Sequence, residues 1–243
     1  KPKDRSRFHD EMDRLPHFRP PAILLPHGTV GNSASGIAPD VSKGKFGPFR
    51  EQLFVADQTH SVINRCFLEK VNGYYQGACF PFVKGFGSGN VPVVQASDGS
   101  LFSGGTDRGW GARGGKRYAL DRVVWTGKTP FEILEMRIRK DGFELEFTKP
   151  VDKESAESLE SYEMKTHTYI FQGKYGSPRV DASTPSIKTA KLAKDGKTVR
   201  LVIEGMQRGH VHELKSAGVR SKEENHPLLH DMAYYTIWNF PKS

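Results

Sequence analysis

The stretch CFLEKVNGYYQGAC, residues 66–79, decides the fold class of this chain. At its centre, Asn72-Gly73 is the strongest short signal for a β-hairpin with a two-residue turn, because both turn positions require a positive φ. Counting outward from the turn pairs Val71 with Tyr74 and, at the far ends, Cys66 with Cys79. The sequence therefore predicts two paired antiparallel strands here.

The same count predicts a disulfide between Cys66 and Cys79. Pairs in an antiparallel ladder alternate between two kinds, and these cysteines fall on a non-hydrogen-bonded pair, where the Cα atoms approach closely enough for the bond. A disulfide implies an oxidising compartment, so we expect a secreted or periplasmic protein. Two other interpretations stay open: two buried thiols that lie opposite each other, or a bulge that shifts the register.

Residues 21–130 around this hairpin have the pattern of an all-β segment. Short apolar runs such as EQLFVAD, VPVVQA and LDRVVW are separated by the turn signals GPF, SGN, SDGS and RGG. Most of the 25 glycines lie between Gly28 and Gly115. Short strands between regular turns, without amphipathic helices, are typical of sheets. Residues 1–20, charged and followed by proline, are predicted to be a connector arm with one helical turn.

Residues 131–243 have a different pattern, with a boundary near Thr129-Pro130. FEILEMRIR and FELEFT flank the turn Asp141-Gly142, and SIKTAKLAK and KTVRLVIEG flank Asp195-Gly196, so each pair predicts a hairpin. THTYIF, HVHEL and AYYTIWNF supply further strands, and a short helix is expected after Val151. About seven strands over this length are typical of a β-sandwich.

Composition excludes several classes of protein. The 243 residues suit one large domain or two small ones. No apolar run is long enough for a helix that spans a membrane. The net charge is +8, but basic and acidic residues are interleaved, as in KPKDRSRFHDEMDR, so we interpret the charge as a solvated surface and expect no nucleic-acid partner.

The first segment resembles the later blades of the glucose and sorbosone dehydrogenase family, soluble β-propellers that use pyrroloquinoline quinone. The motifs that carry this resemblance are SGIAPD (35–40), GPFREQLFVAD (47–57), INRCFLEKV (63–71), VVQASDGSLFSGGTDRGWG (93–111) and LDRVVWTG (120–127). The second segment is similar to bacterial immunoglobulin-like modules in GFELEFTKPVD, ESYEM, AKLAKDGKTVRLVIEG and GVRS, over residues 131–225. The same order of parts is found in large secreted multidomain proteins of planctomycete-type bacteria.

The resemblance implies an all-β chain with a partial β-propeller of about two blades, followed by an immunoglobulin-like β-sandwich. It also implies that a longer parent protein oxidises a sugar or alcohol, with pyrroloquinoline quinone and calcium as cofactors. This portion would act as scaffold and substrate rim. The alternative is a non-enzymatic carbohydrate-binding or protein-binding module. No CxxCH motif occurs, so no covalent haem is implied.

A propeller of two blades cannot be complete. Propellers close with about four to eight blades, and open sheet edges favour aggregation. We therefore expect the missing blades to come from the same precursor or from a partner chain, with carbohydrate as a further partner.

The glycine-rich loop GGTDRGWGARGGKR, residues 104–117, is the first candidate site. Its Trp110 could stack on the apolar face of a sugar ring, while Asp107, Arg108 and Arg113 could bind hydroxyl groups. The alternative is a structural loop in which the tryptophan fills the core and an arginine pairs with the aspartate. No strand–GxGxxG–helix context supports a dinucleotide site.

The histidines form a second candidate site, for zinc or copper. In HVHEL, alternation puts His210 and His212 on one face of a strand, and His230 or His226 could complete the ligand set. His167 is a further possibility. The alternative is that these histidines lie on a solvated face or pack beside Tyr234 and Tyr235. A serine–histidine nucleophile within residues 26–40 has little support, because no GxSxG elbow is present.

Overall fold

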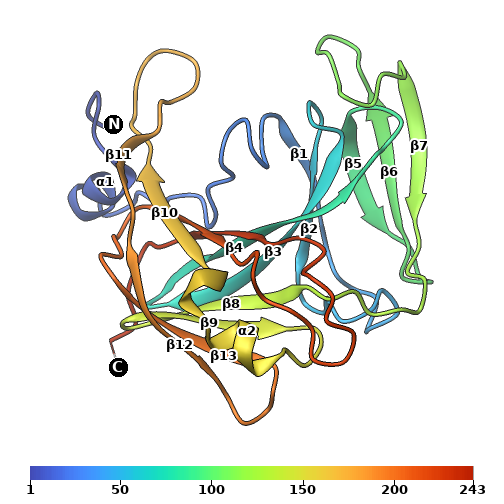
Figure 1. Ribbon diagram of the computed structural model, residues 1–243. Coiled ribbons are helices and arrows are strands. Elements are labelled where there is room, and N and C mark those ends of the chain that lie inside the picture. The colour runs from blue at the N-terminus through green and yellow to red at the C-terminus, as the bar shows by residue number, and fades with distance from the viewer. Residues whose placement is uncertain (243) are drawn as a thin grey trace.

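The computed structural model describes residues 1–242, and it consists mainly of antiparallel strands (Figure 1). The first segment contains β1 (Ala34–Pro39), β2 (Leu53–Asp57), β3 (Val62–Val71), β4 (Tyr74–Lys84), β5 (Asn90–Gln95), β6 (Leu101–Thr106) and β7 (Tyr118–Val123). The second contains β8 (Ile133–Arg139), β9 (Gly142–Phe147), β10 (Glu163–Thr168), β11 (Val180–Ser183), β12 (Ser186–Leu192), β13 (Thr198–Glu204), β14 (Val211–Lys215) and β15 (Met232–Thr236). The helices are α1 (Phe8–Arg14), α2 (Lys153–Glu157) and the 3-10 turn η1 (Leu159–Ser161). The all-β prediction is confirmed.

Within residues 1–242 the strands form three sheets, and none of these sheets is closed into a ring. An eight-stranded sheet has the order β1-β2-β3-β4-β15-β14-β10-β11, a four-stranded sheet the order β12-β13-β9-β8, and a three-stranded sheet the order β5-β6-β7. The eight-stranded sheet contains strands from both sides of Thr129-Pro130, because β15 pairs with β4. The two sequence segments therefore share one sheet.

The hairpin of residues 66–79 forms with the predicted register. Val71 pairs with Tyr74 and Cys66 with Cys79, and the turn residues Asn72 and Gly73 have φ values of 48° and 86°. A register shift does occur, but between Ile63 and Asn64, beyond the cysteines. Cys66 and Cys79 are buried free thiols in the structure, so the bond between them stays a prediction.

The two smaller sheets cover the same face of the eight-stranded sheet. On β3, Ile63 and Phe67 share a face because they are separated by an even number of residues. Ile63 packs in a core with the three-stranded sheet, and Phe67 packs in a core with the four-stranded sheet. Figure 1 shows the four-stranded sheet below the large sheet and the three-stranded sheet at its right. This arrangement leaves the other face for the amino-terminal segment.

The amino-terminal residues pack on that other face. Ile23 and Leu25 join a core that includes Cys66 and Cys79. Helix α1 brings Phe8 against Phe171, at 4.5 Å between ring centroids. The predicted arm thus contains one short helix, and its contacts reach the second segment.

The three-stranded sheet lies close against the large one. A Cβ atom on Gly36 would come within 2.4 Å of the Val91 carbonyl oxygen and 2.8 Å of the Val93 nitrogen. Only glycine permits this approach of the β1 and β5 backbones. Below the contact, Ala38 and Val93 are buried in the shared core. The glycine in SGIAPD therefore fixes how the two sheets stack.

Candidate functional site

The rim loop, residues 107–117 between β6 and β7, is held in place by the turn that joins β2 and β3. Gln58 donates from Nε2 to the carbonyl oxygens of Thr106 and Trp110, each at 3.0 Å. In the other direction, the backbone N–H of Arg113 donates to the Thr59 carbonyl at 3.0 Å. The loop is therefore fixed by its backbone, which leaves its side chains available.

The predicted rim residues project from this loop. Trp110 is 72% exposed, so it does not fill the core as the structural alternative requires. Arg108 and Arg113 are exposed, and Asp107 is half-buried. Within residues 1–242, none of these three forms an ion pair with another side chain. An exposed indole between charged groups is suited to stacking on a ring and donating hydrogen bonds.

Asp57, at the end of β2, organises the backbone around the loop. Its Oδ2 accepts from the backbone N–H groups of Asn32 (2.7 Å) and Ser33 (2.8 Å), and its Oδ1 accepts from that of His60 (2.7 Å). The side chain is 1% exposed. A buried carboxylate needs several donors, and these three join residues 32–33 to the turn that supports the rim loop.

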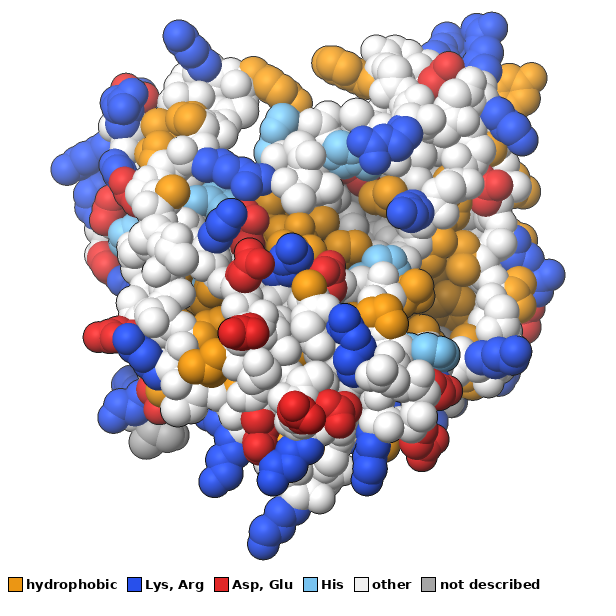
Figure 2. Space-filling view, in the orientation of Figure 1, with side chains coloured by type: hydrophobic (Ala, Val, Ile, Leu, Met, Phe, Trp, Pro, Cys, Tyr) orange, Lys and Arg blue, Asp and Glu red, His pale blue; other side chains and the backbone are white. Residues whose placement is uncertain are grey.

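A basic pocket opens between this turn, the end of β4 and the rim loop. It has a volume of about 220 Å³, and its polar lining includes His60, Lys84, Arg113, His230 and Tyr234. Figure 2 shows lysine, arginine and histidine side chains around a hollow on this face, with hydrophobic side chains inside it. The structure thus brings Arg113 of the rim loop and His230 of the histidine group to one place.

The histidine group does not assemble as a metal site. Within the described chain, no group of three or more His, Cys, Asp or Glu side chains is placed to hold a metal ion. His230 is bound through Nδ1 to Glu132 Oε1 at 2.8 Å, and His226 is exposed. The predicted partners of His210 and His212 are therefore engaged elsewhere or face solvent.

His210 and His212 are buried, so they do not lie on a solvated face. His212 is opposite Tyr235 in the sheet and packs edge-on against Phe143, at 6.0 Å between ring centroids. Burial lowers the pKa of His212 to about 3 and that of His210 to about 4. Both rings are neutral at pH 7, and the alternative of packing beside tyrosine describes His212 correctly.

His167 takes part in a polar chain on the opposite face of the sheet. Its Nδ1 lies 3.1 Å from Glu213 Oε1, and its Nε2 lies 3.1 Å from the Tyr169 hydroxyl. Arg179 donates to the same Glu213 oxygen at 2.9 Å. The hydrogen bond from His167 lowers the pKa of Glu213, and burial raises that of Tyr169, which stays protonated. No sequence motif predicts this polar chain, because Glu213 on β14 and Arg179 before β11 are far from His167 in the sequence.

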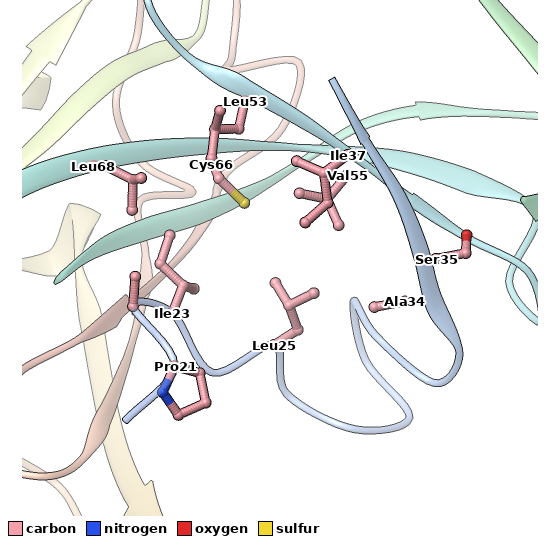
Figure 3. A pocket seen from close by; sticks show the side chains of 11 residues that line it. Pro21, Ile23, Leu25, Ala34, Ser35, Ile37, Leu53, Val55, Cys66 and Leu68 are labelled. Atoms are coloured by element: carbon pink, nitrogen blue, oxygen red, sulfur yellow. The ribbon is translucent and has the colours of Figure 1, made fainter. Parts of the chain in front are cut away.

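An apolar pocket of about 310 Å³ lies between the amino-terminal segment and strands β1 to β3 (Figure 3). Ile23 and Leu25 line it from one side, and Ile37 and Val55 from the other. The thiol of Cys66 points into it. Because its walls are almost all hydrocarbon, this pocket lacks the convergent polar groups of a catalytic site.

Sequence reasoning identified the rim loop but not the other walls of the basic pocket. His60 and Lys84 belong to no motif, and neither is near Arg113 in the sequence. The sequence indicates the role of Asp57 only weakly: it stands directly before the residues QTH, and aspartate is common at the start of a turn.

Comparisons with protein-family models, with curated proteins and with solved structures found no match to this chain. Among the described residues, no helix has the length and apolar character needed to cross a membrane.

Proposed function

We propose that this chain is a scaffold and substrate-rim portion of a larger propeller protein similar to the quinone-dependent sugar dehydrogenases. Strands β1 to β4 follow one another as a four-stranded antiparallel meander, and β5 to β7 form a second meander stacked face to face on it. Stacked meanders of this kind are the units of a propeller. The parent protein would be secreted or periplasmic, in keeping with the opposed cysteines.

The observation that carries this proposal is the outer face of the three-stranded sheet. Val94, Tyr118 and Leu120 lie on this face and are 58%, 77% and 75% exposed. The strand β7 is also an edge strand, with one side of its backbone unpaired in the sheet. Apolar side chains on an open face beside a free edge favour a further sheet as partner, supplied by the same precursor or by a partner chain.

The second segment would be the immunoglobulin-like sandwich of that protein. Its strands divide between two facing sheets, with β8, β9, β12 and β13 in one and β10, β11, β14 and β15 in the other. Phe143 and Leu201 from the first sheet pack with Leu214 and Tyr235 from the second. In this proposal the sandwich has a structural role, holding the neighbouring sheets, and no catalytic role.

The residues present do not fit the calcium ion that accompanies the quinone in the family. Residues 1–242 contain no cluster of three candidate ligands. The quinone and its calcium would be bound by the missing blades, and the chemistry supplied there is hydride acceptance from a sugar or alcohol. This chain would contribute the exposed side chains of the rim loop to the substrate entrance.

The proposal is tested on the protein isolated from its natural source. We expect an intact product longer than 243 residues, or a co-purifying partner chain, together with sugar-dependent dye reduction when pyrroloquinoline quinone and calcium are added. Leu120→Glu should weaken assembly and lower dye reduction, because it introduces a charge into the outer face. Tyr175→Glu is the matched control, since Tyr175 is 91% exposed outside this face. A monomer of this chain alone, indifferent to Leu120→Glu and without activity, would contradict the proposal.

A second candidate is a non-enzymatic carbohydrate-binding or protein-binding module, favoured by the exposure of Trp110. Glycan binding without dye reduction, lost in Trp110→Ala and kept in Tyr175→Ala, would favour this alternative. Titration calorimetry with the purified chain separates the two.

A further inference from the structure

The basic pocket is unusual in the sign of the charges around it. No aspartate or glutamate lines it, whereas Lys84 and Arg113 both do. Neither of these two side chains forms an ion pair with a carboxylate within residues 1–242. Two uncompensated cations beside a partly enclosed cavity attract an anion.

The histidines of the pocket differ in their partners. His230 is engaged through Nδ1 with Glu132, so this nitrogen is not available to a ligand. His60 is different, because its Nε2 atom is buried and has no hydrogen-bond partner among the described residues. A buried ring nitrogen without a partner costs free energy, and a ligand in the pocket would satisfy it.

We propose that the basic pocket binds a small organic anion, with Lys84 and Arg113 holding its charged end and His60 completing the hydrogen bonds. The apolar walls formed by Val62, Pro81 and Val83 suit the carbon skeleton of the ligand rather than a bare inorganic ion. The volume of about 220 Å³ is below the roughly 300–1,000 Å³ of sites for drug-sized molecules. A hydroxy-carboxylate or a sugar acid has the required size and charge.

The backbone that carries these groups is fixed before any ligand arrives. Asp57 holds the His60 N–H, and the Thr59 carbonyl holds the Arg113 N–H. Tyr234, on the pocket wall, has its pKa raised to about 12 by burial, so it remains a neutral donor at pH 7. A preorganised site loses little entropy on binding. The pocket is formed by this chain alone, so the inference goes beyond the proposed function and does not depend on additional blades.

The test compares D-glucuronate with D-glucose by titration calorimetry on the full chain at low ionic strength. The two sugars differ only in the carboxylate at C6, so the difference in affinity reports the charged contact. We expect saturable binding of glucuronate, at least tenfold weaker binding of glucose, and weakening of glucuronate binding by added salt. L-Lactate and inorganic sulfate complete the panel.

Substitutions then assign the site. Lys84→Gln and Arg113→Gln should each weaken carboxylate binding at least tenfold, and both side chains are exposed enough to be replaced without loss of folding. Lys194→Gln is the control for charge, because Lys194 is exposed in the turn between β12 and β13, outside the pocket and the rim loop, and carries the same charge. Thermal unfolding of each variant checks that the fold is kept.

Three results would overturn the inference. The first is the absence of saturable binding of glucuronate or lactate. The second is carboxylate binding that Lys84→Gln and Arg113→Gln leave unchanged. The third is sulfate binding as tightly as either carboxylate, which would show that the apolar walls contribute nothing and that the ligand is not organic.

Discussion

Arg65 lies where the cores under the two smaller sheets meet. Its guanidinium donates to the carbonyl oxygens of Ile133 (2.5 Å) and Leu134 (2.8 Å) and lies over the rings of Phe49 and Phe80, at 4.6 and 4.4 Å. Burial lowers its pKa to about 10, which leaves it charged at pH 7. One side chain of the first segment thus satisfies backbone carbonyls of the second.

Replacing the Arg65 side chain should lower the stability of the fold. Arg65→Met keeps the length of the side chain but removes the guanidinium donor from the Ile133 carbonyl and leaves the Leu134 carbonyl with Gln52 Nε2 alone. We expect the free energy of unfolding to fall by about 3 kcal/mol. Urea denaturation measures this change. Arg108→Met, on the exposed rim loop, should change stability by less than about 0.5 kcal/mol. Equal effects of the two substitutions would show that the contacts of Arg65 are not what stabilises this region.

Buried His212 makes stability depend on pH. The pKa of His212 in the folded chain is about 3, below the ordinary value of 6.5. Between these two pH values, the ring is protonated in the unfolded chain and neutral in the folded chain. The contribution to stability is therefore complete above pH 6.5 and is lost as pH falls toward 3. At about 1.4 kcal/mol per pKa unit, lowering pH from 7 to 4 should cost about 3 kcal/mol from this group.

The variant His212→Gln isolates that contribution. Glutamine keeps an acceptor for the Gln207 N–H, which donates to the His212 ring at 3.2 Å, but does not titrate. Its stability should fall less between pH 7 and pH 4 than that of the unmodified chain. Parallel stability curves for the two proteins would contradict the prediction.

At the scale of elements, the hairpin of β3 and β4 shows which features of a sheet local sequence can predict and which it cannot. Its turn residues and register agree with the sequence, because a two-residue turn fixes the pairing of both strands. Its neighbours in the sheet do not follow from any local signal. β4 pairs with β15, which is more than 140 residues away in the chain. That contact depends on burial of both strands under the four-stranded sheet.

The hairpin also carries the disulfide prediction. The hydrogen bond with Cys66, together with burial, raises the pKa of the Cys79 thiol, so the reduced, folded protein should oxidise slowly. In protein made in an oxidising compartment we expect the bond to form during folding and to add about 3 kcal/mol of stability. Thiol titration of the unfolded, unreduced protein should give no free thiol, and the Cys66→Ala/Cys79→Ala variant should lose the added stability. Recovery of two thiols would reject the bond.

For the whole molecule, the eight-stranded sheet is the unit that joins the two segments. Phe67 and Phe80 from the first segment lie in the same core as Phe143 and Tyr235 from the second. The amino-terminal arm adds an ion pair between Asp13 and Arg208, at 2.7 Å. A sheet and a core that cross the middle of the sequence make the two segments depend on each other.

This arrangement predicts one cooperative unfolding transition for the full chain. Residues 1–129 and 130–243, produced separately, should each be less stable than the full chain, because separation exposes the β4 and β15 edges and divides the shared core. Urea denaturation followed by tryptophan fluorescence and by circular dichroism should give coincident curves. Two separate transitions, each matching an isolated half, would show that the segments fold independently.

The sequence by itself determined the local structure of this protein. Asn72-Gly73, Asp141-Gly142 and Asp195-Gly196 predicted three hairpins that the structure contains, because turn chemistry and strand alternation act over a few residues. It also placed Trp110 and its neighbours on a loop with polar character. These are properties that a short peptide already has.

Only the tertiary structure decided which strands share a sheet and which side chains share a pocket. His60, Lys84 and Arg113 come together because the rim loop is bonded to the turn after β2 and because β4 ends beside that turn. His210 is buried and lies beside His9 of α1, at 6.5 Å between ring centroids, whereas the half-buried His230 is bonded to Glu132. The physical reason is that burial and hydrogen bonding are satisfied by whatever surfaces meet in space, and such meetings have no fixed spacing along the chain.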